Sequence, residues 1–322
     1  MISIVIISKD EASLETTLTD VTCEAADLGE SCEVVVVDAS DGRLDHIRRR
    51  HADRVRWVQF RQPRGVGISI PHQRNAGVCA AKGEIIVFTD AGCRPDPGWL
   101  AGLVAPLRRG EQVTCGLTLA LPGSDSLYDR GARRALQASY LAECPTINLA
   151  FHRGAFEAVD GFDEEFSYGS DVDFSWRLTD AGYRIHGVPH AIIRHDLGTR
   201  RRQLRRSYVY GRARMRLYRK HPERLRHVLR RDPMVVAYPA YLLVFNAAVA
   251  AVILTSPNRR RQPLPMGGLN NVTEPTITGG GSRLRHGQHA RSHGRGIRVG
   301  RDPYPSVAAG AGGRHAAGRA TR

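Results

Sequence analysis

The chain has 322 residues, of which 42% are hydrophobic, and this is enough for the core of one large domain or two ordinary ones. Its formal net charge is +15, but residues 1–193 hold 20 basic residues against 27 acidic ones. The positive charge lies in residues 194–232, with 15 basic residues against 3, and in residues 257–322, with 12 against 2. This distribution excludes a basic nucleic-acid-binding surface spread over the whole chain.

The cysteine spacing argues against a disulfide framework and against a zinc site. None of the six cysteines belongs to a CxxC pair: Cys23, Cys32, Cys79, Cys93, Cys115 and Cys144. We therefore expect reduced, mostly buried thiols in a cytosolic compartment. The first residues enter an apolar run directly and lack a basic leader, so we expect no signal peptide.

Short apolar runs alternate with segments of helical spacing in the first third of the chain. We expect strands over 2–7, 33–37, 55–60 and 85–89, and helices within 8–28, 44–51, 70–81 and from 99 onward. Alternating strands and helices predict a parallel sheet with helices on both faces. Right-handed crossovers bring the ends of the first, second and fourth strands to one edge, which then collects Ser8, Asp38, Ser40, Asp41 and Asp90.

The most informative stretch is residues 80–100, AAKGEIIVFTDAGCRPDPGWL. Its buried strand ends on Asp90, where open α/β sheets bind ligands and where a carboxylate offers a divalent ion a hard oxygen ligand. The alternative is an Asp that only closes a turn. At the same edge, Asp38 and Ser8 suit the base or ribose of a nucleotide, and Arg74 suits a diphosphate. No G-x-G-x-x-G follows the first strand and no P-loop motif occurs, so a dinucleotide-binding Rossmann site and a P-loop enzyme are excluded.

Separate motifs then follow one another in a fixed order: SIVIIS, VVVVDASDG, RNAGVCAAKGEIIVFTDAGCRPDPGWL and GFDEEFSYGSDVDFSWRLTDAGYRI, with His195 after them. Together they resemble glycosyltransferase family 2 over about residues 1–200. The resemblance implies a GT-A-like α/β fold with a mostly parallel central sheet flanked by helices. It also implies a metal-dependent, hexosyltransferase-type enzyme with Mn²⁺ or Mg²⁺ as cofactor. Such an enzyme moves a sugar from a nucleotide diphosphate sugar to an acceptor hydroxyl with inversion.

The resemblance also assigns roles to single residues. Asp38 would contact the base of the nucleotide, and Asp90 is the first aspartate of the family's metal-binding D-x-D. Asp171 falls where the family has the aspartate that acts as catalytic base, and His195 falls where a late histidine joins the metal or diphosphate site. These assignments meet what inverting transfer needs, namely a general base for the acceptor hydroxyl and a cation beside the departing diphosphate.

Two positions depart from the family's motifs. The second aspartate of the D-x-D is Gly92 here, so a cation has one carboxylate fewer unless Asp96 or a water compensates. The glutamate of the family's Glu-Asp pair is Ser170. These departures leave open weaker metal binding, or a catalytically silent protein that binds a nucleotide sugar without turnover.

Without the resemblance, simpler interpretations apply to the same residues. Asp171 and Asp173 would be acids in the first turn of a helix, where they favour the macrodipole. His195 would be a histidine at a strand end with no role in binding. We do expect Asp171 near the start of a helix, because Phe174 and Leu178 have helical spacing.

Residues 1–198 are thus expected to form the GT-A-like catalytic domain, and three further segments follow it. Residues 199–232 predict a basic helix that either is solvated or contacts anionic lipid headgroups. Residues 233–256 end in a run of 23 uncharged residues. At about 1.5 Å per residue this run predicts a transmembrane helix of about 34 Å, or a membrane-associated hairpin. Residues 257–322, rich in Gly, Arg and His, are expected to be disordered.

These segments extend the expectation to the setting of the reaction. A cytosolic nucleotide sugar would place the catalytic domain on the cytoplasmic face of the membrane. Membrane proximity suggests a lipid-linked or cell-envelope glycan as the acceptor. A basic tail that binds RNA or DNA is the less favoured alternative, because no nucleic-acid-binding motif supports it.

Overall fold

The computed structural model describes residues 1–122, 126–196, 198 and 200–227. The predicted membrane segment, 233–256, and the tail predicted to be disordered, 257–322, both lie outside the described residues. Among the described helices, none has the length and apolar character that crossing a bilayer requires.

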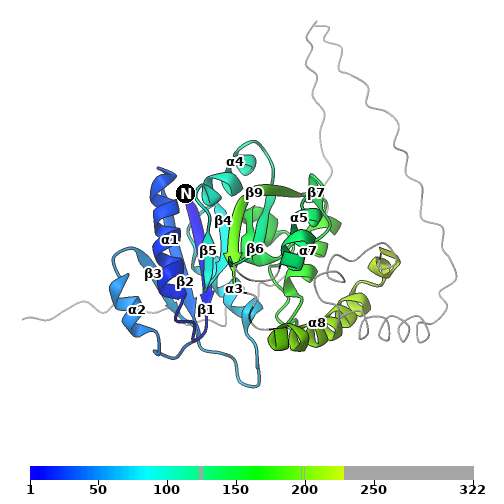
Figure 1. Cartoon of the computed structure of the whole chain (residues 1–322), viewed down its shortest axis with the longest axis horizontal. Coiled ribbons are helices and arrows are strands. Elements are labelled where there is room, and N and C mark those ends of the chain that lie inside the picture. The colour runs from blue at the N-terminus through cyan, green and yellow to red at the C-terminus, as the bar shows by residue number, and fades with distance from the viewer. Residues whose placement is uncertain (123–125, 197, 199, 228–322) are drawn as a thin grey trace, which may run out of the picture. The chain divides into compact units, whose positions relative to one another are not determined.

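The described residues form one nine-stranded sheet in the order β3-β2-β1-β4-β8-β6-β9-β5, with β7 paired to β9 (Figure 1). The strands are β1 (Ile2–Ser8), β2 (Cys32–Asp38), β3 (Val55–Gln59), β4 (Ile85–Asp90), β5 (Cys93–Pro95), β6 (Val113–Ala120), β7 (Tyr140–Leu141), β8 (Leu149–His152) and β9 (Ile185–His195). The first four in spatial order are parallel, as the sequence predicts. Beyond β4 the sheet is mixed, because β8 runs antiparallel to both of its neighbours.

The helices cover both faces of the sheet, which confirms the predicted layered arrangement. They are α1 (Leu14–Asp27), α2 (Asp45–Arg50), α3 (Ile70–Ala80), α4 (Trp99–Arg108), α5 (Ser126–Ala135), α6 (Arg153–Glu157), α7 (Ser170–Asp180) and α8 (Arg200–Lys220), with short 3₁₀ turns η1 (Thr146–Asn148) and η2 (Pro222–His227). Alternate residues of each strand point to opposite faces. In β1, Ile4 therefore packs with α1 and α4, whereas Val5 packs with α3 and α7.

Strand register sets the edge on which the predicted site residues lie. Ser8 at the end of β1 is paired with Asp38 at the end of β2. On the other side of β1, Ile7 is paired with Asp90 at the end of β4. Because all three strands are parallel, their carboxyl ends form one edge, and the predicted gathering of Ser8, Asp38 and Asp90 is confirmed.

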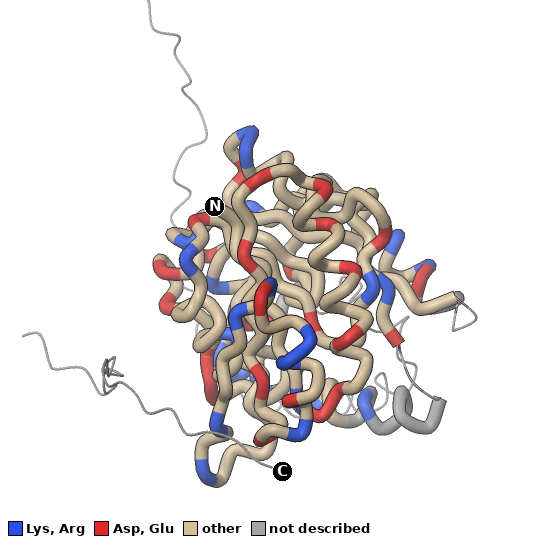
Figure 2. Tube along the Cα trace, turned by 90° about the vertical axis from the view of Figure 1, so that its left-hand side faces the viewer, with Lys and Arg blue, Asp and Glu red and all other residues tan. Residues whose placement is uncertain are grey.

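Charged residues of both signs are interspersed over the side of the molecule drawn in Figure 2.

The basic helix α8 is not fully solvated. Its second half packs on the domain through Leu217 and Tyr218, which are 1% and 4% exposed. The Trp176 ring of α7 lies 5.6 Å from the ring of Tyr218.

A buried carboxylate fastens α8 to α7. Asp173 in the first turn of α7 is fully buried, and it accepts a hydrogen bond from His221 Nε2 at 2.8 Å. Lys220 Nζ lies 2.7 Å from the same carboxylate, and Arg177 Nε donates to it at 2.8 Å. Burial raises the pKa of Asp173, but these cationic partners lower it further, so its pKa lies below the ordinary value.

We predict that Asp173→Asn lowers the free energy of unfolding by about 3 kcal/mol, because the fully buried carboxylate is the shared partner of His221, Lys220 and Arg177 and an amide cannot replace its charge. Denaturant unfolding at neutral pH measures this change. The matched control is Asp163→Asn, which removes a partner 2.6 Å from the same Lys220 at a more exposed position and should cost less than about 1 kcal/mol. Equal losses in the two variants would show that Asp173 does not fasten the helix.

Candidate functional site

The two polar residues at the ends of β1 and β2 are buried. Ser8 and Asp38 are 3% and 1% exposed. One carboxylate oxygen of Asp38, Oδ1, accepts hydrogen bonds from the backbone N–H of Ser40, at 3.1 Å, and from its hydroxyl. The other oxygen, Oδ2, and the Ser8 hydroxyl have no hydrogen-bond partner among the described residues. Buried polar atoms are nearly always paired, so both atoms are suited to a ligand that supplies the missing partners.

Burial also affects the protonation of Asp38. It raises the pKa of this carboxyl above the ordinary value, and the hydrogen bonds from Ser40, together with the nearby Trp57 side chain, offset only part of the rise. A ligand N–H that bonds to Asp38 would therefore also stabilise its ionised form.

Arg74 lies next to Asp90 at the same edge. Its guanidinium comes from α3, is 5% exposed, and places Nη2 3.3 and 3.4 Å from the two oxygens of Asp90. The Nε of Arg74 is buried and has no hydrogen-bond partner in the described part of the chain. An anion such as a diphosphate would satisfy this donor, while Asp90, whose side chain is 27% exposed, keeps oxygens available for a cation.

Asp171 begins α7, as the sequence predicts. Gly169 caps this helix in a left-handed conformation, with φ at +78°, and Asp171 occupies the first turn beside Ser170. Burial raises the pKa of Asp171 above its ordinary value, and the positive charges of Arg74 and Arg214 lower it in part. The charge of Arg74, which contacts Asp90, therefore also favours the ionised form of Asp171.

His195 lies at the end of β9, where it is paired in register with Cys93 of β5 and with Ala120 of β6. Cys93 follows Asp90 by only three residues, so the structure brings His195 to the turn that begins at the predicted metal ligand. The backbone of His195 thus lies beside the turn that follows Asp90.

The predicted replacement of the missing carboxylate by Asp96 has a competing contact. Arg194 binds both oxygens of Asp96, through Nε at 2.7 Å and Nη2 at 2.9 Å. This bidentate pair holds β5 against β9 and occupies the carboxylate.

The backbone explains why position 92 carries glycine. Its φ is +89°, and a Cβ there would lie 3.2 Å from the hydroxyl of Ser13.

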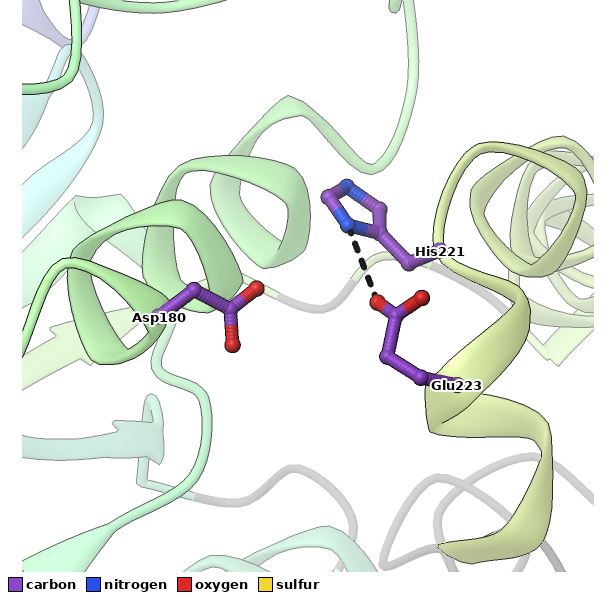
Figure 3. A group of neighbouring side chains, drawn as sticks. All are labelled: Asp180, His221 and Glu223. Atoms are coloured by element: carbon purple, nitrogen blue, oxygen red, sulfur yellow. Dashed lines mark ion pairs between the residues drawn. The ribbon is translucent and has the colours of Figure 1, made fainter. Parts of the chain in front are cut away.

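A second group of ligand-type side chains lies at the other end of α7 (Figure 3). The candidate ligand atoms of Asp180, His221 and Glu223 lie within 4.8 Å of one another. However, Asp180 is already paired with Arg224, and His221 uses Nε2 to bond Asp173. His221 Nδ1 is 3.6 Å from Glu223. We therefore assign this group to the junction of α7 with the end of α8, in which Arg224 supplies the positive charge.

Residues 3–158 match the family described as glycosyl transferase family 2. The chain is 31% identical over 169 residues to the pre-mycofactocin glycosyltransferase of Mycobacterium tuberculosis, a match that covers 47% of this chain and 35% of that protein. It is 24% identical over 161 residues to glycosyltransferase AglE of Haloferax volcanii, covering 45% of this chain and 50% of that one. The matched region thus spans half or less of these relatives' own length.

Among solved structures, the fold is similar to that of the mannosyltransferase PcManGT from Pyrobaculum calidifontis in complex with GDP-Man and Mn²⁺. The TM-score is 0.53 at 21% identity, over 80% of this chain and 76% of that one. The match to glycosyl transferase family 2 is thus confined to residues 3–158. The mixed sheet between two helical layers, which continues beyond that range to β9, is the GT-A fold that the motifs predicted.

The match to the family ends at residue 158, so α7 with Asp171 and all of α8 lie beyond the matched region.

Sequence reasoning missed several contacts that shape the site. Gln73 Nε2 donates to the carbonyl of Ser8 at 3.1 Å, and Thr17 Oγ1 accepts from the N–H of Gly92 at 3.0 Å. Arg214 of α8 stands among many other basic residues in the sequence. Each of these contacts joins residues far apart in the chain, and no local pattern signals them.

We predict that Gly92→Ala lowers the free energy of unfolding by about 1–2 kcal/mol, because an L-residue at this positive φ is strained. Thermal or denaturant unfolding measures the effect. Gly67→Ala is the control, since Gly67 lacks a positive φ and has open space around it, and this change should be neutral or slightly stabilising. If Gly92→Ala were as stable as the parent chain, conformational strain would not explain the glycine.

Proposed function

We propose that this chain transfers a sugar from a nucleotide diphosphate sugar to an acceptor hydroxyl with inversion, at the edge where β1, β2 and β4 end. One observation carries the proposal. Ser8, Asp38 and Arg74 each hold a buried polar atom without a hydrogen-bond partner among the described residues, and they lie at the edge that also carries Asp90. A nucleoside diphosphate offers the groups that these atoms lack.

Each part of the donor has a matching group at this edge. Asp38 Oδ2 accepts from an N–H of the base, because Oδ1 is already taken by Ser40. Arg74 donates its Nε to a diphosphate oxygen. Asp90 and His195 would hold a divalent cation, Mn²⁺ or Mg²⁺, which when bound supplies positive charge to the leaving diphosphate. The relative solved with GDP-Man and Mn²⁺ supports a donor and a cation of these classes.

Asp171 is the group that we assign to proton abstraction. Its ionised carboxylate accepts the proton of the acceptor hydroxyl as the hydroxyl oxygen bonds to the anomeric carbon. The bond from that carbon to the diphosphate oxygen breaks at the same time, and Arg74 stabilises the charge that appears on the diphosphate. Arg74 contacts Asp90, and its charge also favours the ionised form of Asp171, so one guanidinium serves both residues.

For the acceptor, we propose a lipid-linked or cell-envelope glycan at the cytoplasmic face of a membrane. The support comes from sequence alone, since the uncharged run of 234–256 follows the Arg-dense segment 199–231. The second candidate function is a donor-binding protein without turnover. Gly92 and Ser170, which replace two acidic residues of the family motifs, favour it.

We predict that Asp171→Asn abolishes turnover while donor binding persists. Donor binding is measured as the thermal shift produced by UDP-sugars and by GDP-mannose with Mn²⁺, and turnover as the release of nucleoside diphosphate. In the parent chain the rate should fall as pH drops through the raised pKa of Asp171, above the ordinary value of about 3.9. Full activity of the variant would contradict the assignment of the base, and binding without turnover in the parent chain would favour the second candidate.

The same substitution should raise the unfolding temperature at neutral pH. A carboxyl whose pKa is raised by folding favours the folded state only while it is protonated, and this contribution is lost as pH rises through the folded pKa. Asparagine avoids the cost of an ionised buried group. The difference between variant and parent should disappear in acid, where both side chains are neutral.

A further inference from the structure

Helix α8, which lies beyond the region matched by the family, contacts the turn that leads into Asp171. Gly169, which caps α7 two residues before Asp171, packs against α8. A Cβ built on Gly169 would lie 3.0 Å from Leu217 Cδ1, a tight contact, and the φ of +78° at this position also favours glycine. Leu217 is itself 1% exposed. The first turn of α7 is therefore in direct contact with α8.

A buried ion pair anchors α8 at the same place. Arg214 is 6% exposed, and its guanidinium binds both oxygens of Glu143, at 2.9 and 2.7 Å. The guanidinium also lies over the ring of Trp176, 5.2 Å from its centroid. A planar guanidinium with two hydrogen bonds to one carboxylate and an aromatic ring beneath it is held in a single orientation. Lysine cannot reproduce this geometry.

Glu143 is in turn connected to the backbone of Asp171 by a short path. The N–H of the next residue, Cys144, donates to Ser175 Oγ at 3.2 Å. The same Ser175 hydroxyl donates to the carbonyl oxygen of Asp171 at 2.8 Å. A shift of Glu143 would therefore move the segment that is hydrogen-bonded to the turn carrying the base.

We propose that α8 forms the wall of the transfer site beside the base, and that Arg214 is a positioning residue that holds Asp171 for proton abstraction through Glu143, Cys144 and Ser175. The proposal rests on the transfer function proposed above. It gives a role to a helix outside the region matched by the family, residues 3–158. It also explains why Arg214 is buried while its neighbours Arg212, Arg216 and Arg219 are exposed. The charge of Arg214 additionally favours the ionised form of Asp171.

The structure offers a matched control in Arg224. Its guanidinium lies over the same Trp176 ring, 5.7 Å from the centroid, but it pairs with Asp180 at the far end of α7. Asp180 follows Asp171 by nine residues, which is about 13 Å along a helix at ~1.5 Å per residue. Loss of Arg224 thus removes a similar contact with Trp176 and leaves the turn of the base intact.

The experiment compares Arg214→Gln with Arg224→Gln in the full chain. Turnover is measured as release of nucleoside diphosphate with water as the acceptor, using the donor that gives the thermal shift with Mn²⁺. We expect Arg214→Gln to lower kcat about tenfold or more, because a small misplacement of a catalytic group is costly, while the Kd for the donor is unchanged. Arg224→Gln should keep kcat. Arg214→Lys, which keeps the charge but loses the bidentate bond, should lie between the two.

Hydrogen exchange gives a second measurement that does not depend on turnover. The backbone amides of 170–175 should exchange faster in Arg214→Gln than in Arg224→Gln or the parent chain. If Arg214→Gln fails to fold because the half-buried Glu143 is left unpaired, the double variant Glu143→Gln/Arg214→Gln removes both charges and replaces it in the comparison.

The outcomes separate this inference from the proposed function. Equal kcat and equal exchange in the Arg214 and Arg224 variants would overturn the positioning role, as would a loss of donor affinity in Arg214→Gln. If the parent chain neither binds nor turns over any donor, the proposed function fails. The exchange comparison then still decides whether Arg214 orders the turn that carries Asp171.

Discussion

The parallel register of three neighbouring strands is the constraint on which the rest of the site depends. Ser8 and Asp38 are partners across β1 and β2, and Asp90 is the partner of Ile7 across β1 and β4. A slip of one residue in either pairing would turn the strand-end side chains to the opposite face of the sheet. The register is fixed because both faces of these strands are buried, with Ile4 and Val5 each 0% exposed.

This arrangement places charged groups where burial makes them costly. Asp38 and Asp171 both have raised pKa values because burial disfavours their ionised forms. Asp173, two residues after Asp171, has a lowered pKa because hydrogen bonds from His221 and the positive charges of Lys220 and Arg177 stabilise its ionised form. Two acids in the same helical turn thus differ in role. Asp173 is paired and fastens α8, whereas Asp171 is the residue that we propose as the catalytic base.

The sequence allowed the N-terminal half of the fold to be predicted, because its signals are local. Each of β1, β2 and β4 is a short apolar run that ends on Ser8, Asp38 or Asp90, and alternation with helices implies parallel pairing. The strands β6 and β9 were not predicted, and β8 reverses the direction of the sheet. Their pairing joins segments that are distant in the chain, and no periodicity encodes which strands become neighbours.

The site was predicted less completely than the sheet. Strand ends and the start of a helix located Asp38, Asp90 and Asp171, but the pairing of Asp96 with Arg194 is a long-range contact that spacing does not reveal. The inward orientation of Arg214 was equally hidden, because its neighbours in the sequence are also arginines. In physical terms, local patterns position backbone ends, whereas the partners of buried charges are chosen by packing between distant elements.

The central claim is that the edge formed by β1, β2 and β4 binds the diphosphate donor. A crystal structure of the chain with Mn²⁺ and the nucleoside diphosphate of its donor tests it most directly. The account predicts that the nucleobase contacts Asp38, that the diphosphate contacts Arg74 and that the cation binds Asp90. A nucleotide bound away from this edge, or a cation bound instead between Asp180, His221 and Glu223, would contradict it.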